Sequence, residues 1–388
     1  MKTQHRPAAA GGYSWTPTRR SVEQVVAPLV ERGDAKGEAE GEAEDAIGNP
    51  RRGRRAHPED ATMQAVVQDR YGSADVLRLA RIPVPTIGER DVLVEVHAAG
   101  LDRGTWHLMT GEPYLQRLAL GFRGPKQPVP GRDVAGTVVA VGRAVTSFAP
   151  GDEVYGVGRG SFAELTVVRE DRLARKPANV TFEQAAVVPV SGLTALHGVV
   201  DVGRVESGQK VLVTGASGGV GSYAVQLARA FGAEVTGVAS TGKLDLVRSL
   251  GADHVIDYTQ EDFADGVHHY DLVVDIAGRP TLSRLRRALT PTGTAVLVGG
   301  EDGGRLTGGM NRQLRALALS PFVGQRLTMV VNRESGQDLE RLTDLIEAGK
   351  VTPSIDRTYP LAEVPAAMRH LEAGHARGKV AVTVRPPS

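Results

Sequence analysis

The chain of 388 residues contains no cysteine. This absence excludes disulfide bonds, thiolate catalysis, iron–sulfur clusters and every zinc site that uses cysteine ligands. The sequence also has no run near the ~18 consecutive apolar residues that a membrane span requires, and no apolar secretion segment at its N-terminus. A reducing compartment fits these absences, and we expect a cytoplasmic protein that does not insert into a membrane.

An excess of charge of one sign is missing as well. The 46 Lys and Arg residues nearly balance the 45 Asp and Glu residues, which leaves a formal net charge of +1. This balance produces no global field that would favour nucleic acid or an anionic membrane surface. We therefore expect a small-molecule ligand held by a local site, in a chain long enough for about two domains.

The first part of the chain differs in composition from the rest. An acidic low-complexity run occupies residues 37–45, and an arginine-rich run occupies residues 51–55. Because such a composition buries too little apolar surface to offset the entropy of ordering, we expect residues 1–62 to form a disordered extension. A patch for nucleic acid or a partner and an organelle-import peptide are the alternatives, and Met63 is a candidate functional start.

Residues 63–187 carry short strand patterns separated by glycine and proline. The strand-like runs lie at residues 63–68, 91–98, 134–141 and 162–168. Runs of this length, punctuated by turn residues, are typical of β-structure. The region is predicted to be an irregular β-rich domain.

Residues 188–333 alternate short apolar runs with segments of helical periodicity. Strands are predicted at 211–214, 234–239, 254–256, 271–276, 294–298 and 327–331, and helices at 222–231, 243–250 and 282–289. Repeated β–α alternation predicts an α/β domain with a doubly wound parallel sheet. Residues 334–388 follow with two further helical patterns and a last strand at 379–384.

A glycine-rich turn joins the first of these strands to its helix. It reads Gly-Ala-Ser-Gly-Gly-Val-Gly over residues 215–221. Glycine allows the backbone to approach a pyrophosphate, and the helix N-terminus offers free N–H groups and a positive dipole end. We expect the cofactor to contact Ser217, Gly218, Gly219, Val220 and Gly221.

The end of the next strand predicts which dinucleotide binds. An Asp or Glu there would accept the ribose 2′-hydroxyl of NAD, but the chain continues with Ser240, Thr241 and Lys243. Hydroxyl and ammonium donors suit a 2′-phosphate, which a carboxylate would repel. The sequence therefore predicts NADPH, and we add Tyr258 and Gly299 to the expected cofactor contacts.

The turn also matches the TGxxxGxG pattern of short-chain dehydrogenases. Those enzymes need a Tyr-x-x-x-Lys pair for proton transfer, and none of the eight tyrosines here has Lys four residues later. Their glycine turn also lies near the start of the domain, whereas here a long β-rich region precedes it. We therefore set this alternative aside.

Several further motifs follow one another between Met63 and Val384. They are AAGLD at 98–102, GRDVAGTV at 131–138, PGDEV at 150–154, GSFAE at 160–164, AAVVPVSGLTA at 185–195, LGADHVIDY at 250–258 and RGKV at 377–380. With these motifs the chain resembles the medium-chain dehydrogenase/reductase superfamily, specifically its quinone oxidoreductase-like branch.

The resemblance implies an architecture of two domains. Residues 63–187 would begin a GroES-like β-rich catalytic domain, and residues 188–333 would form a Rossmann NADPH-binding domain. Residues 334–388 would return to complete the catalytic domain. The resemblance also implies a homodimer formed through edges of the nucleotide domains.

The resemblance further implies a reaction without zinc. Zinc-dependent relatives carry a Cys where Asp102 stands and a His-Glu pair where Arg132 and Asp133 stand. Without a Lewis acid, reduction of an already activated acceptor is expected, with NADPH delivering a hydride to a quinone, enone or enal. A nucleotide-binding sensor with little turnover and an NAD(P)-dependent alcohol dehydrogenase remain the alternatives.

No acid–base constellation stands out near the expected substrate. Asp102, Arg132 and Thr194 are the substrate-site candidates, and Trp106, His107 and Tyr114 are further possible hydrogen-bond donors. For each of them a place in a hydrogen-bonded pocket wall is the alternative reading. The segment 115–126 is expected to be either a lid over the substrate or a surface helix.

Overall fold

The computed structural model describes residues 61–300 and 304–385. The chain divides into two units, Met1–Ala61 and Thr62–Ser388. The extension that the composition predicts to be disordered lies outside the described residues, except for its last two. Thr62 already belongs to strand β1 (Thr62–Val67), one residue before the predicted boundary.

The β-rich part contains a seven-stranded sheet in the order β14-β15-β3-β4-β5-β7, with β6 pairing β3. Its strands are β3 (Asp91–Leu101), β4 (Asp133–Val141), β5 (Glu153–Val157), β6 (Leu165–Arg169), β7 (Leu173–Arg175), β14 (Ile355–Pro360) and β15 (Lys379–Thr383), and a separate hairpin pairs β1 with β2 (Arg78–Pro83). Valines on β3 and β4 are buried because both faces of these central strands are covered. This sheet is the predicted β-rich domain.

The end of the chain supplies an interior strand of this sheet. β15 lies between β14 and β3 and pairs antiparallel with β3, with Val380 opposite Leu101. Helices α11 (Gly336–Glu347) and α12 (Val364–Glu372) precede it, and α12 packs against β15. Residues from the two ends of the second unit therefore share one sheet.

The second sheet is parallel throughout and runs β10-β9-β8-β11-β12-β13. Its strands are β8 (Lys210–Thr214), β9 (Glu234–Ala239), β10 (His254–Asp257), β11 (Tyr270–Asp275), β12 (Leu289–Leu297) and β13 (Arg326–Met329). The helices connected to it are α6 (Gly219–Ala230), α7 (Leu244–Ser249), α8 (Leu282–Ala288), α9 (Gly304–Thr307) and α10 (Met310–Leu319). This order is that of the doubly wound sheet that the β–α alternation predicts.

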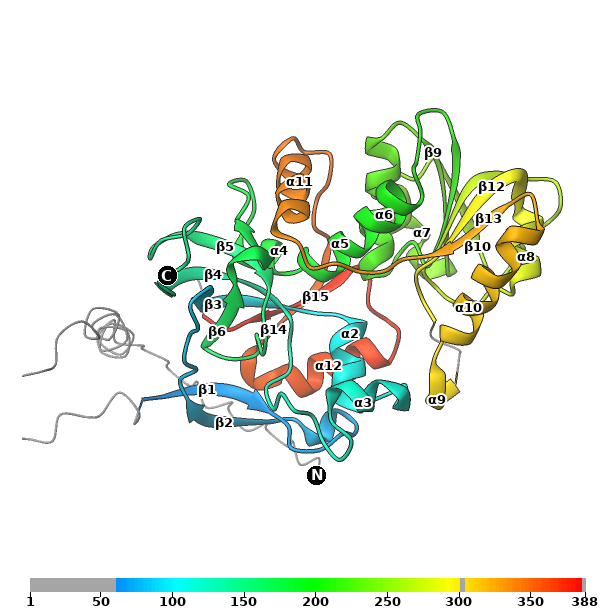
Figure 1. Ribbon diagram of the computed structural model, residues 1–388. Coiled ribbons are helices and arrows are strands. Elements are labelled where there is room, and N and C mark those ends of the chain that lie inside the picture. Colours follow the sequence, from blue (N-terminus) through cyan, green and yellow to red (C-terminus); the bar gives the residue numbers. More distant parts are fainter. Residues whose placement is uncertain (1–60, 301–303, 386–388) are drawn as a thin grey trace, which may run out of the picture. The chain divides into compact units, whose positions relative to one another are not determined.

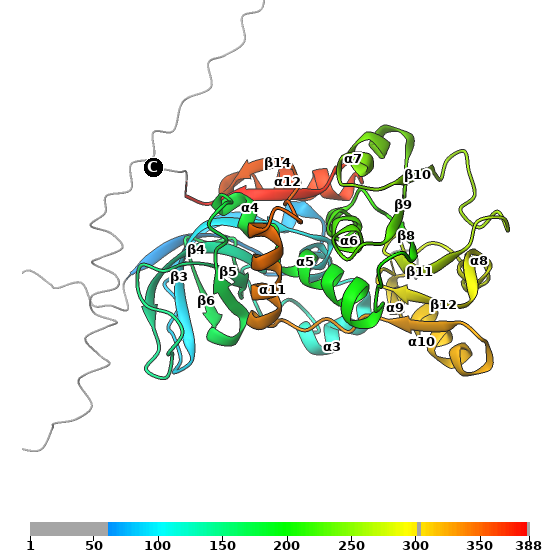
Figure 2. The same ribbon diagram turned by 90° about the horizontal axis from the view of Figure 1, so that it is seen from above.

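Helix α5 (Pro189–Leu196) lies between the two sheets in both ribbon views (Figures 1 and 2). One hydrophobic cluster runs through this region and includes side chains from both sheets. Two buried tyrosines secure it: the hydroxyl of Tyr155 on β5 donates to the carbonyl of Leu339, and that of Tyr223 on α6 donates to the carbonyl of Val187. Helix α5 therefore packs into a core that both sheets share.

The segment 115–126 forms less helix than a surface helix would require. A single 3-10 turn (Tyr114–Gln116) leads into α3 (Arg117–Leu120), and Gly121, at φ 123°, ends that short helix. Leu118 and Phe122 are exposed. The segment is thus a short helical turn followed by a loop, beside helix α2 (Arg103–Thr110).

Candidate active site

The glycine-rich turn follows β8 and opens helix α6. Gly215 adopts φ 68°, and the N–H of Gly218 closes the turn on the carbonyl of Gly215 at 3.0 Å. A Cβ at Gly221 would lie 2.1 Å from the same carbonyl oxygen, so this position has no room for a side chain. The first N–H groups of α6 have no partner within the helix, which makes the turn a cradle for an anion such as a pyrophosphate.

The C-terminal segment meets the back of this cradle. The N–H of Gly378 donates to the carbonyl of Ser217 at 2.8 Å. The side chain of Lys379 passes beneath the turn, because a Cβ at Gly219 would come within 3.0 Å of its Cδ. The turn and the sheet of the catalytic domain are therefore held together through residues 378 and 379.

Lys379 also forms a buried ion pair. Its Nζ lies 3.2 Å from Oδ2 of Asp133 on β4 and donates to Oγ of Ser191 on α5 at 3.0 Å, and both charged side chains are almost fully buried. Burial raises the pKa of the Asp133 carboxyl to about 6, although the Lys379 ammonium acts in the opposite direction. The carboxylate of Asp102 adds to this rise.

Asp102 begins helix α2 beside this pair. Its Oδ1 accepts a hydrogen bond from the N–H of Thr105 at 2.7 Å and so caps the helix. Its Oδ2 is buried and has no hydrogen-bond partner among the described residues. One carboxylate oxygen of Asp102 is thus free to bind a donor.

Arg132 lies directly before β4, and Thr194 lies on α5. The position of a Cβ on Gly104 would lie 3.1 Å from Oδ1 of Asp102 and 3.7 Å from Nη1 of Arg132, so both side chains flank Gly104. Arg132 forms an ion pair with Glu334. Thr194 donates its hydroxyl to the carbonyl of Val190 at 2.6 Å and accepts from Nδ2 of Asn332 at 2.6 Å.

Comparison with known proteins agrees with this geometry. Residues 88–178 match the family model of the alcohol dehydrogenase GroES-like domain, and residues 250–382 match that of the zinc-binding dehydrogenases. The chain is 38% identical over 330 residues to the 2-methylene-furan-3-one reductase of Solanum lycopersicum, which covers 80% of this chain and 76% of that protein. It belongs to the medium-chain dehydrogenase/reductase superfamily, in the quinone oxidoreductase-like branch.

Two further relatives lie in the same branch. The chloroplastic NADPH-dependent alkenal/one oxidoreductase of Arabidopsis thaliana is 39% identical over 338 residues, with 82% of this chain and 79% of that protein covered. The solved quinone oxidoreductase from Coxiella burnetii superposes with a TM-score of 0.74 at 28% identity and covers 84% of this chain and all of that one. The predicted fold class, a GroES-like domain with a Rossmann domain, is confirmed.

The superfamily's zinc positions hold residues that do not form a metal-binding set. A guanidinium stands at Arg132, where a histidine ligand would be needed. Asp133 is already paired with Lys379, and Asp102 uses one oxygen to cap α2. The sequence also has no cysteine for a structural zinc lobe. These residues therefore do not fit the zinc of other superfamily members.

The expected 2′-phosphate site lies at the carboxyl end of β9. Nζ of Lys243 donates to the carbonyls of Gly374 at 2.8 Å and Ala376 at 2.9 Å, and burial lowers the pKa of this ammonium group. Two of the three Lys243 protons are thus used to hold the C-terminal segment. Tyr258 is half-exposed nearby, and its N–H donates to the carbonyl of Ala239.

The end of β10 carries a carboxylate that the sequence reading did not include. Asp257 accepts hydrogen bonds from the hydroxyls of Thr241 and Thr259 and from Nε2 of Gln260, and these bonds lower the pKa of its carboxyl. No acid stands at the end of β9, but Asp257 stands at the end of the adjacent strand β10. Its Oδ2 is bound by Thr241 just after β9 as well as by Gln260 of its own loop.

The remaining sequence candidates have hydrogen-bond or packing partners of their own. Nε1 of Trp106 donates to Glu372, and Nδ1 of His107 faces the carbonyl of Glu112 at 2.6 Å. Tyr114 is partly exposed and packs under the guanidinium of Arg117. Gly299 follows β12, where its N–H donates to the carbonyl of Asp275 at 3.2 Å. Trp106, His107 and Tyr114 thus have structural partners.

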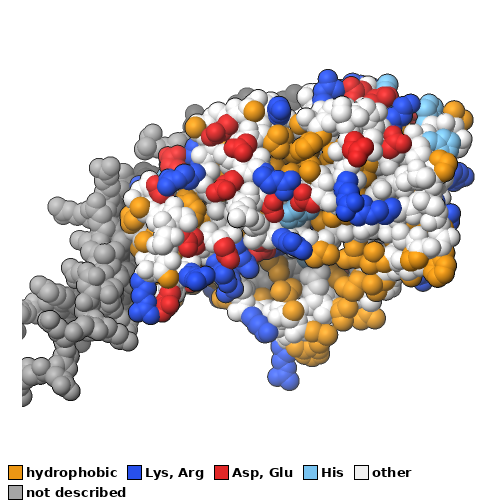
Figure 3. Space-filling view, turned by 45° about the horizontal axis from the view of Figure 1, so that its top comes forward, with side chains coloured by type: hydrophobic (Ala, Val, Ile, Leu, Met, Phe, Trp, Pro, Cys, Tyr) orange, Lys and Arg blue, Asp and Glu red, His pale blue; other side chains and the backbone are white. Residues whose placement is uncertain are grey.

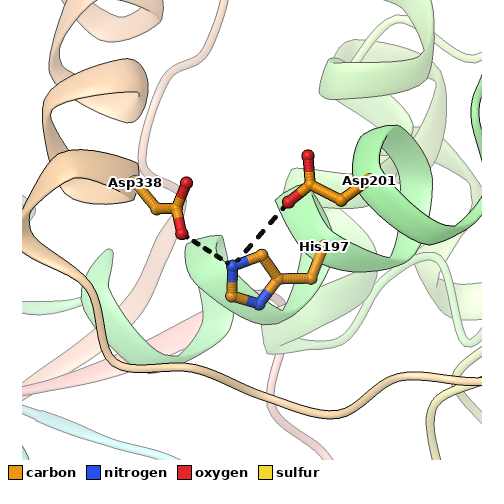
Figure 4. A group of neighbouring side chains, drawn as sticks. All are labelled: His197, Asp201 and Asp338. Carbon is orange, nitrogen blue, oxygen red and sulfur yellow. Dashed lines mark hydrogen bonds and ion pairs between the residues drawn. The ribbon is translucent and has the colours of Figure 1, made fainter.

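A second polar cluster joins the turn after α5 to helix α11 (Figure 4). Nε2 of His197 lies 3.1 Å from Asp338 and 3.9 Å from Asp201. Arg341 binds both carboxylates, at 2.8 Å to Asp338 and 3.0 Å to Asp201. Because this guanidinium already compensates the two acids, the cluster acts as a cross-link between the two segments.

Across residues 61–300 and 304–385, no helix has both the length and the apolar character needed to cross a membrane.

Proposed function

We propose that this oxidoreductase uses NADPH to reduce a quinone, enone or enal and works without zinc. The observation that carries the proposal is an intact dinucleotide cradle beside a cleft whose metal positions hold Asp102 and Arg132. The names of the relatives point in the same direction, because they describe a furanone reductase, an alkenal/one oxidoreductase and a quinone oxidoreductase. When bound, NADPH would supply the hydride that the acceptor receives.

Arg132 and Asp102 are placed to stabilise and protonate the negatively charged product of hydride transfer. Reduction of an enone leaves an enolate oxygen, and the guanidinium of Arg132, which flanks Gly104 together with Asp102, can stabilise it. Oδ2 of Asp102 is buried without a partner and can hold the proton that completes the reaction, or solvent can supply that proton. The hydroxyl of Thr194 already donates its proton to the carbonyl of Val190. We therefore propose that Thr194 positions Asn332, from which it accepts a hydrogen bond.

The cofactor preference rests on the end of β9. Ser240 and Lys243 stand where an NAD-specific protein would carry an acid, and Lys243 retains one donor beyond its two bonds to backbone carbonyls. The cofactor contacts at residues 217–221, Ser240, Lys243, Tyr258 and Gly299 belong to the same proposal.

The proposal is tested by following NADPH oxidation with a panel of quinones, enones and enals. We expect turnover with several acceptors, faster with NADPH than with NADH, and no loss of rate after dialysis against a chelator. Tight binding of NADPH without turnover of any acceptor would instead indicate a nucleotide sensor. Alcohol oxidation that depends on stoichiometric zinc would indicate an alcohol dehydrogenase.

A homodimer in the cytoplasm completes the proposal. β13 is an edge strand of the nucleotide sheet, and α10, which packs against it, exposes Met310, Leu314 and Leu317, while Leu306 is exposed on α9. Figure 3 shows hydrophobic side chains gathered along the lower right of the surface in that view. An unpaired edge beside an apolar face suits pairing with a second copy, which sedimentation would detect as twice the monomer mass.

A further inference from the structure

A cavity of about 250 Å³ opens beside the candidate active site. Arg132 and Glu334 lie in its wall, and Arg132 also flanks Gly104 together with Asp102. Leu120 and its neighbours form an apolar side, and Gln68, Arg159 and Arg172 supply the polar side. An acceptor that places its reactive carbon in the cleft can extend a substituent into this cavity.

The polar side of the cavity carries an excess of positive charge. Three arginines and one glutamate line it, which leaves two positive charges after Glu334 is counted. Glu334 binds both Arg132 and Arg172, the latter at 2.5 Å. Arg159 has no acidic partner among the described residues, and its side chain is exposed. A second anion could therefore neutralise positive charge that Glu334 leaves uncompensated.

The arginines are close enough to repel one another. Burial is the main cause that lowers the pKa of the Arg172 guanidinium; the carboxylate of Asp171 raises it, and the charges of Arg159, Arg169 and Arg132 lower it. An anion that binds between these guanidinium groups would reduce their repulsion. A planar guanidinium can donate to two oxygens of one carboxylate or phosphate. The positive charge of the cavity thus favours a ligand that carries a carboxylate or a phosphate.

An unpartnered buried group gives independent evidence that a ligand enters here. Gln68 is 2% exposed and lines the cavity. Its Nε2 donates to the carbonyl of Leu108 at 3.3 Å, but its Oε1 has no partner among the described residues. An unsatisfied buried acceptor is costly, and an N–H or O–H group elsewhere on a ligand would remove this cost, whereas the oxyanion itself cannot donate to it.

We propose that this cavity is a subsite for an oxyanion group, a carboxylate or a phosphate, carried by the acceptor substrate. Arg159 and Arg172 bind the anion, and Arg132 links the subsite to the reacting carbonyl. The inference rests on the proposed reductase function, because the anion is a substituent of the enone or quinone. The preferred acceptor is therefore an anionic unsaturated carbonyl compound with an apolar body that packs on the Leu120 side.

The binding test uses molecules that cannot be reduced. Calorimetric titration of the NADP⁺-loaded protein would compare 3-benzoylpropionate with 3-benzoylpropionamide, which have nearly the same shape and differ in charge. We expect the carboxylate to bind more tightly and Arg159→Gln to reduce this preference about fivefold, the value of a partly exposed ion pair. Arg159→Lys should retain part of it, and 2-phenylethyl phosphate shows whether phosphate is the better oxyanion.

A matched control separates the subsite from general loss of positive charge. Arg143 is an exposed arginine of the same domain that pairs with Glu89 outside the cavity, so Arg143→Gln should leave the preference unchanged. Equal binding of the acid and the amide to the wild-type protein would overturn the inference. So would a preference that is as large in Arg159→Gln as in the wild-type protein.

The turnover test separates this inference from the proposed function. The ratio of kcat/KM for trans-3-benzoylacrylate to that for trans-3-benzoylacrylamide should fall in Arg159→Gln to the same extent as the binding preference. If both compounds are reduced and the ratio is the same in the wild type and the variant, the subsite is wrong and the reductase function stands. If neither is reduced while carboxylate binding depends on Arg159, the subsite stands and the function fails.

Discussion

Replacement of Lys379 by methionine should destabilise the protein strongly at pH 8 and much less at pH 5. Lys379 is 2% exposed, and its ammonium compensates the fully buried carboxylate of Asp133. Removal of one partner of a buried ion pair typically costs about 3–5 kcal/mol, because the other charge stays buried without compensation. We expect a loss of that size in Lys379→Met at pH 8.

The dependence on pH follows from the raised pKa of Asp133. The carboxyl has a pKa of about 6 in the folded protein and an ordinary value of 3.8, so the folded state binds a proton more readily than the unfolded chain. This difference corresponds to roughly 3 kcal/mol that opposes folding when the group is ionised and is recovered as the pH falls through 6 toward 3.8. Without Lys379 the pKa rises further, so the variant recovers more stability on acidification than the wild type.

Urea unfolding followed by circular dichroism at pH 5 and pH 8 measures the effect. The double variant Asp133→Asn/Lys379→Met removes both charges and should regain most of the stability at pH 8. Arg143→Met removes an exposed pair and should cost less than about 1 kcal/mol at either pH. An equal deficit of Lys379→Met at both pH values, or a double variant as unstable as the single one, would refute the reasoning.

Two other predictions concern the cofactor. Gly221→Ala places a methyl group 2.1 Å from the Gly215 carbonyl oxygen, so it should distort the turn and weaken NADPH binding at least about tenfold in a fluorescence titration, whereas Gly242→Ala, in open space, should not. Lys243→Ala should raise the KM for NADPH much more than that for NADH if its remaining donor binds the 2′-phosphate. Equal changes in both KM values would show that Lys243 does not bind the 2′-phosphate and only donates to the carbonyls of Gly374 and Ala376.

Local patterns predicted the nucleotide domain well because its signals lie within a few residues. The strand at 234–239 was predicted with the bounds that the structure shows, and the glycine turn lies between a strand and a helix as expected. By contrast, α10 was not predicted, although Met310, Leu314 and Leu317 recur along it at helical spacing. β14 was missed because none of its residues is fully buried, which leaves no clear apolar alternation.

The site was only partly predictable because its main contacts join distant parts of the chain. Glu334 meets Arg132 across 202 residues, and Lys243 binds carbonyls more than 130 residues away. No spacing rule relates such positions. The resemblance supplied the motif around Lys379, but nothing in the sequence indicated that its ammonium would be buried against Asp133.

The position of β15 has a consequence for how the protein is made. β3 leaves the ribosome early, yet its partner along one edge is the strand Lys379–Thr383, some 280 residues later. At synthesis rates of roughly 5–20 residues per second, that edge of β3 stays unpaired for about 14–56 seconds. An exposed strand edge invites pairing with other chains, so yield in a cell should respond to translation speed and to chaperones that shield nascent strands.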